Sequence, residues 1–219
     1  MNETKKNINE QITEILLGFS TVSALIFSLF IIWCRKNDYN HFLTSLFVAD
    51  PIARNAIFAF RAFNIETALV QDVAKTPEIA LMRLEWWKSA IDDALNERPP
   101  SHPALTEVSI AAKNLKPSKM WFTKILNQRI EMLSRSNFAT LDAMETYAEQ
   151  TASSLLYLQL EALGIRNSNI EHACGHLGKA IGIATLLKGF PHALQSQRIY
   201  IPSQILANVT FSICKTDLF

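Results

Sequence analysis

The stretch DPIARNAIFAFRAFNIETALVQD, residues 50–72, decides the fold, because it joins a helix start signal to a long apolar periodicity. Asp50 can cap a helix, and Pro51 follows at the first helical position, where a missing N–H loses no hydrogen bond. Apolar residues then recur at helical spacing along one stripe, namely Ile52, Ala56, Ala59, Phe63 and Val70. The pattern predicts one long helix packed inside a helical protein.

Three polar residues, Arg61, Asn64 and Glu66, interrupt the most apolar part of this helix. Glu66 shares its side with several apolar residues, so its carboxylate is expected to be buried and to need a partner. Arg83 on the next predicted helix is the candidate partner, since Arg61 is poorly placed five residues away on the same helix. Two interpretations remain open: a structural ion pair inside a helical bundle, or the remnant of a polar site that lines a cavity between helices.

The rest of the chain after residue 34 also carries helical signals, separated by proline and glycine breaks. Thr140 is placed to cap one helix, Gly164 follows its end, and Gly189 with Pro191 is expected to end the last helix. No alternating strand pattern is present. The sequence predicts an all-α single domain whose helices span about 38–48, 51–72, 77–96, 104–113, 117–133, 141–163 and 168–188.

Composition narrows the class of protein further. The chain has 219 residues, of which 49% are hydrophobic, and this is enough to bury a sizeable core. Its net charge is +1, so no nucleic-acid-binding surface is expected. Three cysteines, Cys34, Cys174 and Cys214, lie far apart and are odd in number, which argues against a disulfide framework and against a cysteine zinc site.

Residues 15–33 contain no charged side chain, and Arg35 and Lys36 follow them. As a helix with a rise of 1.5 Å per residue, this segment would reach close to the ~30 Å hydrocarbon thickness of a bilayer. We therefore predict a membrane segment, with a buried segment as the alternative. Residues 1–14 mix both signs of charge, unlike the arginine-rich, acid-poor amphipath of a mitochondrial transit peptide.

Two clusters resemble metal sites only superficially. Asp92, Asp93 and Glu97 fall opposite the apolar stripe of their helix, so a solvated face explains them. His172 and His176 lie one turn apart, but no third ligand accompanies them. Nucleotide-binding and hydrolase motifs are also missing from the sequence. We therefore predict no catalytic residue, no metal site and no cofactor.

Several segments nevertheless resemble the squalene/phytoene synthases, which are head-to-head isoprenoid synthases. The resemblance covers about residues 34–207 and is carried by LMRLEWWKSAIDDALNERPPSHPAL (81–105), AMETYAEQTASSLLYLQLEALG (143–164) and HLGKAIGIATLLKGFPHALQSQRIYIP (176–202). It implies an all-α, isoprenoid-synthase-like helical bundle that lacks the last family helices here. The ends, 1–33 and 208–219, match nothing expected of the family, and we expect an alternative product or read-through of intron sequence there.

The resemblance also implies where a catalytic site would lie. Enzymes of the family carry two aspartate-rich motifs whose carboxylates hold Mg²⁺ against substrate diphosphates. The first, D-D-x-x-D, falls on residues 68–72, where only Asp72 is acidic. The aspartates of the second fall on Gly189 and Ala193. Asp72 is thus expected to be the remnant of a diphosphate and magnesium site, and the resemblance implies a pseudoenzyme.

Within the family, residues 38–72 and the SSLLYLQLEALGI run (153–165) look most like a non-catalytic branch that assists early assembly of mitochondrial respiratory complex I. The implied partners are complex I assembly intermediates or other assembly factors and the inner-membrane surface. The implied location is the matrix side of the mitochondrial inner membrane. An isoprenoid- or quinone-binding protein is the alternative, and an active head-to-head prenyl transferase is a further one.

Overall fold

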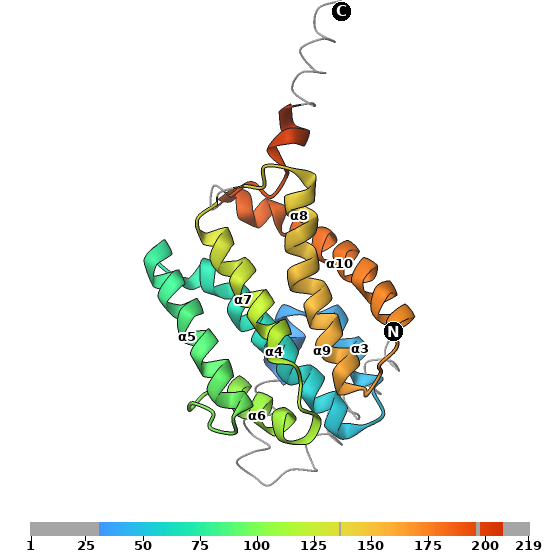
Figure 1. The fold of residues 1–219 in the computed structure, drawn as a ribbon. Coiled ribbons are helices and arrows are strands. Elements are labelled where there is room, and N and C mark those ends of the chain that lie inside the picture. The colour runs from blue at the N-terminus through green and yellow to red at the C-terminus, as the bar shows by residue number, and fades with distance from the viewer. Residues whose placement is uncertain (1–30, 136, 196–197, 208–219) are drawn as a thin grey trace, which may run out of the picture. The chain divides into compact units, whose positions relative to one another are not determined.

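The computed structural model describes residues 31–135, 137–195 and 198–207, and nearly all of them are helical (Figure 1). The predicted all-α class is confirmed, and an isolated bridge between Asn137 and Ile199 is the one strand-like pairing in these ranges. The named elements are α3 (Tyr39–Leu46), α4 (Pro51–Val73), α5 (Pro77–Leu95), α6 (Pro103–Leu115), α7 (Lys119–Leu133), α8 (Leu141–Ala148), the π-helical turn η1 (Glu149–Ser153), α9 (Ser154–Ala162) and α10 (Ser168–Gln195).

Side-chain caps fix the helix ends where the sequence predicts them. The Asp50 carboxylate accepts hydrogen bonds from the backbone N–H groups of Ile52 and Ala53, at 3.2 and 3.1 Å. The Thr140 hydroxyl accepts one from the Ala143 N–H at 3.2 Å. Gly164 follows α9 with φ of +67°, a left-handed conformation that glycine adopts without strain. The two side-chain caps accept hydrogen bonds from backbone N–H groups that have no partner within the helix, and the Gly164 conformation lets the chain leave α9.

The chain divides into two compact units, and α4 and α5 each contribute to both. Unit 1 contains residues up to Glu66 and Ala90–Pro117. Its described core is aromatic: Phe42 of α3 lies 5.8 Å from Phe58 of α4, measured between ring centres. The fully buried large side chains of this unit are Ile31, Phe42, Phe58, Phe60, Phe63, Ile91 and Leu105.

Unit 2 contains Thr67–Ser89 and the chain from Ser118 onward. Here α8, η1 and α9 form one continuous helical segment, and α10 and α7 both pack against it (Figure 1). A small apolar cluster of Met132, Phe138 and Met144 closes one part of the unit, with Tyr147, Ile183 and Leu186 packed against it.

Two glycines allow α10 to lie close to α8 and η1. A Cβ at Gly178 would lie only 2.4 Å from the Cα of Ser153 and 2.6 Å from its nitrogen. A Cβ at Gly182 would lie 2.9 Å from the Cα of Ala148. Backbone atoms cannot move aside as the end of a side chain can, so the helix–helix distance here requires glycine.

The last helix is longer than the sequence predicts. We expected α10 to end near Lys188, before Gly189 and Pro191, but it continues through Pro191 to Gln195. Proline removes its own N–H hydrogen bond and crowds the carbonyl four residues earlier, but Pro191 lies on an exposed face, where the helix can bend and continue.

No helix in the described ranges is both long enough and apolar enough to cross a bilayer. The predicted membrane segment, 15–33, lies almost entirely outside those ranges, as does the 208–219 tail. These two expectations therefore remain predictions.

Candidate functional site

A cavity of about 250 Å³ in unit 2 brings the two sequence-predicted motif positions together. Ala68 and Asp72 reach it from α4, and Gly189 and Ala193 reach it from α10. The pair on α4 and the pair on α10 are more than a hundred positions apart in the sequence, yet all four residues line one space. We name it the Asp72 cavity, after the acidic residue in its lining.

Asp72 does not face the cavity as a free carboxylate. Its Oδ1 accepts a hydrogen bond from the guanidinium of Arg198, with which it forms an ion pair. The Arg198 backbone N–H in turn donates to the carbonyl of Ala193 at 2.9 Å, which ties this arginine to the second motif position. A guanidinium thus binds the one acidic side chain that the sequence predicts for the ancestral metal site.

Three other ionisable side chains of the Asp72 cavity are Arg129, His192 and Tyr200. Arg129 of α7 lines it and is only 9% exposed, and burial lowers the pKa of its guanidinium. His192 also lines it. Burial raises the pKa of the Tyr200 hydroxyl, against the opposing effect of Arg198. Two arginines and a histidine therefore accompany the one carboxylate of this lining.

The donor set does not fit Mg²⁺, which prefers several carboxylate or carbonyl oxygens in near-octahedral geometry. Asp72 is the one carboxylate in the lining, and Arg198 already occupies it. More generally, the described residues hold no group of three or more His, Cys, Asp or Glu side chains that could bind a metal ion. Within them, His172 and His176 lie with ring centres 4.7 Å apart but gain no third ligand.

The three polar residues of α4 lie in different environments. Arg61 is 4% exposed, and its Nη1 donates to Oδ2 of Asp38 at 3.1 Å. Asn64 and Glu66 are both partly exposed. Burial raises the pKa of Glu66, and no ion pair of this carboxylate is present among the residues that the structure describes. The sequence thus identified the buried arginine, but it did not identify Asp38 as its partner.

Asp38, Arg61 and Cys34 form a connected buried group in unit 1. Burial works against the charged form of Asp38, but the hydrogen bond with His41 and the charge of Arg61 outweigh it, and the pKa of Asp38 is lowered. Burial and the neighbouring Asp38 raise the pKa of the Cys34 thiol to about 12. This thiol lies 3.9 Å from the carbonyl oxygen of Phe58, to which it donates. A protonated, buried thiol is a poor nucleophile, so the group is structural.

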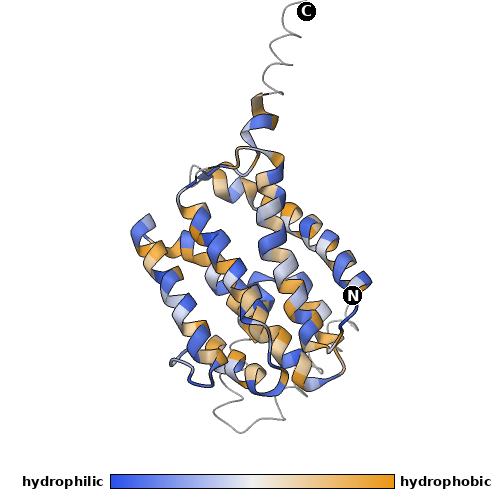
Figure 2. Cartoon of the chain, in the orientation of Figure 1, coloured by the Kyte–Doolittle hydropathy of each residue, from blue (hydrophilic) through white to orange (hydrophobic). Residues whose placement is uncertain are grey.

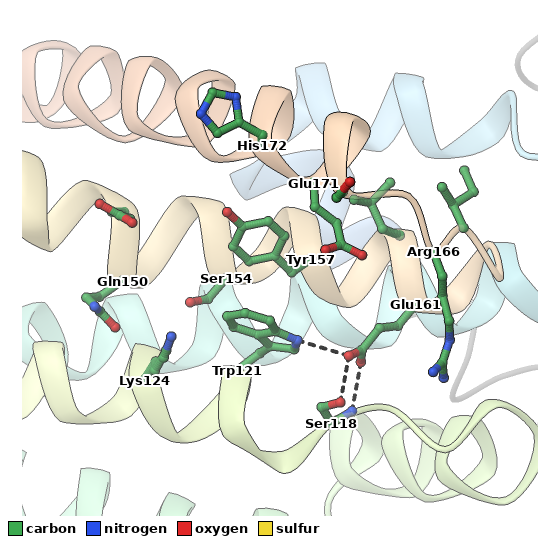
Figure 3. Close-up of a pocket in the computed structure, with 14 residues that line it drawn as sticks. Ser118, Trp121, Lys124, Gln150, Ser154, Tyr157, Glu161, Arg166, Glu171 and His172 are labelled. Carbon is green, nitrogen blue, oxygen red and sulfur yellow. Dashed lines mark hydrogen bonds between the residues drawn. The ribbon is translucent and has the colours of Figure 1, made fainter.

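A second cavity in unit 2, of about 520 Å³, was not predicted from the sequence (Figure 3). Trp121 of α7 and Tyr157 of α9 form one wall, with ring centres 4.5 Å apart, and the Lys124 Nζ lies 4.6 Å from the Trp121 ring centre. The Glu161 carboxylate accepts hydrogen bonds from the Ser118 N–H and hydroxyl at 2.7 and 2.6 Å, and from the Trp121 indole at 3.0 Å.

This arrangement clamps the start of α7 to α9. The Glu161 carboxylate therefore uses three of its acceptor sites within the protein. Helical periodicity could place Trp121 and Tyr157 on their helices, but it could not show that the two helices bring them together. The cavity lies beside η1, and π-helical turns are frequent at functional sites.

The comparisons with known proteins agree with this geometry. The squalene/phytoene synthase family matches residues 34–213. The squalene synthase HpnC from Alicyclobacillus acidocaldarius has a similar fold, with a TM-score of 0.73 at 15% identity, over 89% of this chain and 72% of that one.

The relatives with higher sequence identity are named as complex I assembly factors and not as synthases. The Bos taurus protein "NADH dehydrogenase (ubiquinone) complex I, assembly factor 6" is 39% identical over 171 residues, which are 78% of this chain and 51% of the relative. Its Dictyostelium discoideum homologue is 39% identical over 77% of this chain and 47% of its own length. A presqualene diphosphate synthase from Sinorhizobium fredii is 22% identical over 74% of this chain and 58% of its own. The chain thus spans about half the length of these relatives.

Proposed function

Because this chain belongs to the squalene/phytoene synthase family, we propose that it is a non-catalytic member that acts in the assembly of mitochondrial respiratory complex I. The relatives at 37–39% identity are named as complex I assembly factors, whereas the synthase relative matches at 22%. We extend the proposal to the location: the matrix side of the mitochondrial inner membrane, with assembly intermediates or other assembly factors as partners.

One observation carries the non-catalytic part of this proposal. The Asp72 cavity contains the motif positions 68, 72, 189 and 193, but only one of these is a carboxylate, and it is paired with Arg198. A single carboxylate held by a guanidinium offers a divalent cation little to bind. Removing Arg198 would leave one carboxylate, which is still too few for several magnesium ions.

The assembly function is tested by deleting the gene and measuring complex I on native gels, together with NADH:ubiquinone activity. We expect both to fall, and we expect the re-expressed chain and its Asp72→Ala variant to restore both. The Gly178→Ala variant serves as the control for loss of folded protein, because its new Cβ would overlap Ser153. Normal complex I in the deleted cells would overturn the proposal.

The absence of catalysis is tested separately with purified protein. The chain is incubated with Mg²⁺ and labelled farnesyl or geranylgeranyl diphosphate, beside an active synthase of the same family as the positive control. We expect no head-to-head product from this chain. Detection of such a product, lost in Asp72→Ala, would show an active prenyl transferase and would contradict the reading of Asp72 as a remnant.

A second candidate function, binding of an isoprenoid such as a quinone, is favoured by the mixed lining of the Asp72 cavity. Leu84, Met132 and Leu186 provide apolar walls beside the Asp72–Arg198 pair. Ligand pockets usually measure about 300–1,000 Å³, so this cavity suits only part of such a molecule. Native mass spectrometry of gently purified protein tests the idea, since a bound isoprenoid adds a defined mass that Leu186→Trp should remove.

A further inference from the structure

A short segment after α10, residues 198–204, lies beside the connection between α7 and α8 (Figure 1). We name this segment the strap. The Ser203 N–H donates a hydrogen bond to the Phe138 carbonyl at 2.9 Å, and the Gln204 N–H donates one to the Ala139 carbonyl at 3.3 Å. These backbone bonds attach one end of the strap to the α7–α8 connection.

The Ser203 side chain adds to this attachment. Its hydroxyl accepts a hydrogen bond from the Asn137 side-chain amide at 2.9 Å and donates one to the Phe138 carbonyl at 3.3 Å. The preceding residue, Pro202, is buried. We name residues 202–204 the anchored end of the strap, because backbone and side-chain hydrogen bonds both hold it in place.

The other end of the strap, residues 198–200, forms part of the Asp72 cavity, whose lining includes Arg198 and Tyr200. Hydrophobic segments recur on α7 and α10, two of the helices around this cavity (Figure 2). The apolar part of the lining includes Leu84, Met132 and Leu186. The cavity measures about 250 Å³, whereas ligand pockets usually measure about 300–1,000 Å³. A polar end of the strap thus bounds an apolar space that is too small for most ligands.

Two contacts hold this second end of the strap against the rest of unit 2. One is the isolated bridge between Ile199 and Asn137. The other is the ion pair of Arg198 with Asp72, which joins the strap to α4. Both members of the pair are partly exposed, so water and salt reach it. The pair is therefore a contact that can be broken without the loss of a backbone hydrogen bond.

We propose that the strap regulates access to the Asp72 cavity, with the Asp72–Arg198 pair as its latch. In the latched state the pair holds residues 198–200 beside the cavity and keeps the cavity small. When the pair breaks, these residues move away and an apolar molecule reaches the cavity wall, while the anchored end stays in place. The proposal concerns access to the cavity and does not depend on a function in complex I assembly.

A partly exposed ion pair suits a latch because it is weak. Its loss changes an equilibrium by at most about fivefold, which corresponds to about 1 kcal/mol. A ligand that binds only the released state has an apparent affinity proportional to the fraction of protein in that state. Breaking the pair should therefore tighten binding of such a ligand by the same factor.

The test measures binding of Nile red, a neutral fluorescent dye, to the full chain for wild type, Asp72→Asn and Arg198→Gln. A neutral dye is used because its attraction to the cavity does not change when a charge is removed. We expect each variant to bind the dye more tightly than wild type, by up to about fivefold. The double variant should bind no more tightly than either single one, since both substitutions break the same contact.

The position of the dye is tested by filling the cavity. Leu186→Trp, added to Arg198→Gln, should remove the gain in affinity, because Leu186 lines the cavity. Leu177→Trp is the matched control, since Leu177 is exposed on the same helix and is not part of this lining. Circular dichroism should show unchanged helix content in every variant. Equal affinities for wild type and both single variants would overturn the proposal, and so would a gain that survives Leu186→Trp.

Salt provides an independent measurement of the latch. Raising sodium chloride from about 0.1 M to about 1 M shortens the Debye length from about 10 Å to about 3 Å and weakens the ion pair. The affinity of wild type for the dye should then approach that of Arg198→Gln, which has no pair to screen. A ratio of the two affinities that stays constant with salt would contradict the proposal.

Amide hydrogen exchange, followed by NMR, locates the movement within the strap. In Arg198→Gln, the amide at position 198, which donates to the Ala193 carbonyl in wild type, should exchange faster. The amides of Ser203 and Gln204 should keep their wild-type rates, because the anchored end stays bound. Unchanged rates at all three positions would show that the ion pair does not hold the strap. Faster exchange at all three would show that the strap detaches as a whole, and either result would overturn the proposal.

Discussion

Two aspartate–arginine pairs, one in each unit, differ in how deeply they are buried. In unit 1, Arg61 is 4% exposed and Asp38 20%, and their atoms lie 3.1 Å apart. In unit 2, Arg198 is 15% exposed and Asp72 31%, and this pair lines an open cavity. The arginine is therefore buried in the first pair, whereas both members of the second pair are partly exposed.

The difference separates stability from function. A buried charge that loses its partner destabilises the fold strongly, because water cannot replace the partner. A pair that water reaches contributes little, because solvent screens it. Asp38 and Arg61 are thus expected to matter for folding, whereas Asp72 and Arg198 can be changed to ask what the Asp72 cavity does.

The largest effect is expected from breaking the buried pair. Asp38→Ala leaves the Arg61 guanidinium buried without its carboxylate, which should lower the free energy of unfolding by about 3–5 kcal/mol. Urea denaturation followed by circular dichroism measures this loss. The labelling rate of Cys34 provides a local measurement in unit 1, since its pKa of about 12 keeps the thiol protonated and its burial requires opening before it reacts.

The pH dependence of this pair has a defined direction. The pKa of Asp38 is lower in the folded protein than its ordinary value of 3.8, so its stabilisation is present above pH 3.8 and is lost as the pH falls through the folded pKa. The variant should therefore lose less stability on acidification than wild type. A double variant, Asp38→Leu with Arg61→Leu, should be more stable than Asp38→Ala, because it leaves no charge unpaired. Equal urea midpoints for wild type and Asp38→Ala would contradict the assignment.

A second substitution destabilises unit 2 without touching its aspartate. Gly178→Ala places a Cβ 2.4 Å from the Cα of Ser153, and the resulting overpacking should destabilise the protein by about 1–3 kcal/mol. Gly189→Ala is the matched control on the same helix, since its Cβ would meet nothing within 4 Å. Thermal unfolding should show a loss for Gly178→Ala and a neutral or slightly stabilising effect for Gly189→Ala. An unchanged Gly178→Ala melting temperature would mean that α10 does not pack this closely.

A smaller effect is expected at Glu66, where the structure differs from the sequence-based hypothesis of a buried pair. A pKa raised by burial means that the folded state binds this proton more tightly, so wild-type stability falls as the pH rises above about 4.5. Glu66→Gln should therefore raise stability at pH 7, by less than about 1 kcal/mol because water still screens a half-buried carboxylate. The gain should shrink as the pH approaches 4.5. A loss at pH 7 would instead support the original hypothesis of a stabilising partner.

Sequence patterns were sufficient for the features that depend on neighbouring residues. Caps at Asp50 and Thr140, the break at Gly164 and the apolar stripe of α4 predicted where helices lie. Local signals failed at Pro191, because a proline that faces outward can be accommodated within a helix. They also failed for charge partners, since Asp38 lies 23 residues from Arg61 and Arg198 lies 126 residues from Asp72. Only the packing of separate helices determines such pairs.

The resemblance to a family predicted one feature that the local sequence patterns could not predict. Motif alignment assigned the five positions 68, 69, 72, 189 and 193 to one site, and the structure places four of them, all except Leu69, in the lining of one cavity. It did not identify Arg129 or Arg198, because these arginines are not part of the motifs. The arginines that line the Asp72 cavity were therefore identified only from the folded structure.

The smallest effect on stability is expected at Asp72. Asp72→Ala removes a pair whose carboxylate is 31% exposed, so the free energy of unfolding should fall by less than about 1 kcal/mol. Because the carboxylate is already occupied by Arg198, we also expect complex I levels in complemented cells to match those of wild type. Arg198→Ala is the partner control, since it leaves the carboxylate in place and open to a cation. If Asp72→Ala abolishes complementation while its urea midpoint stays at the wild-type value, the carboxylate acts in function, and a purely structural remnant is the wrong interpretation of this residue.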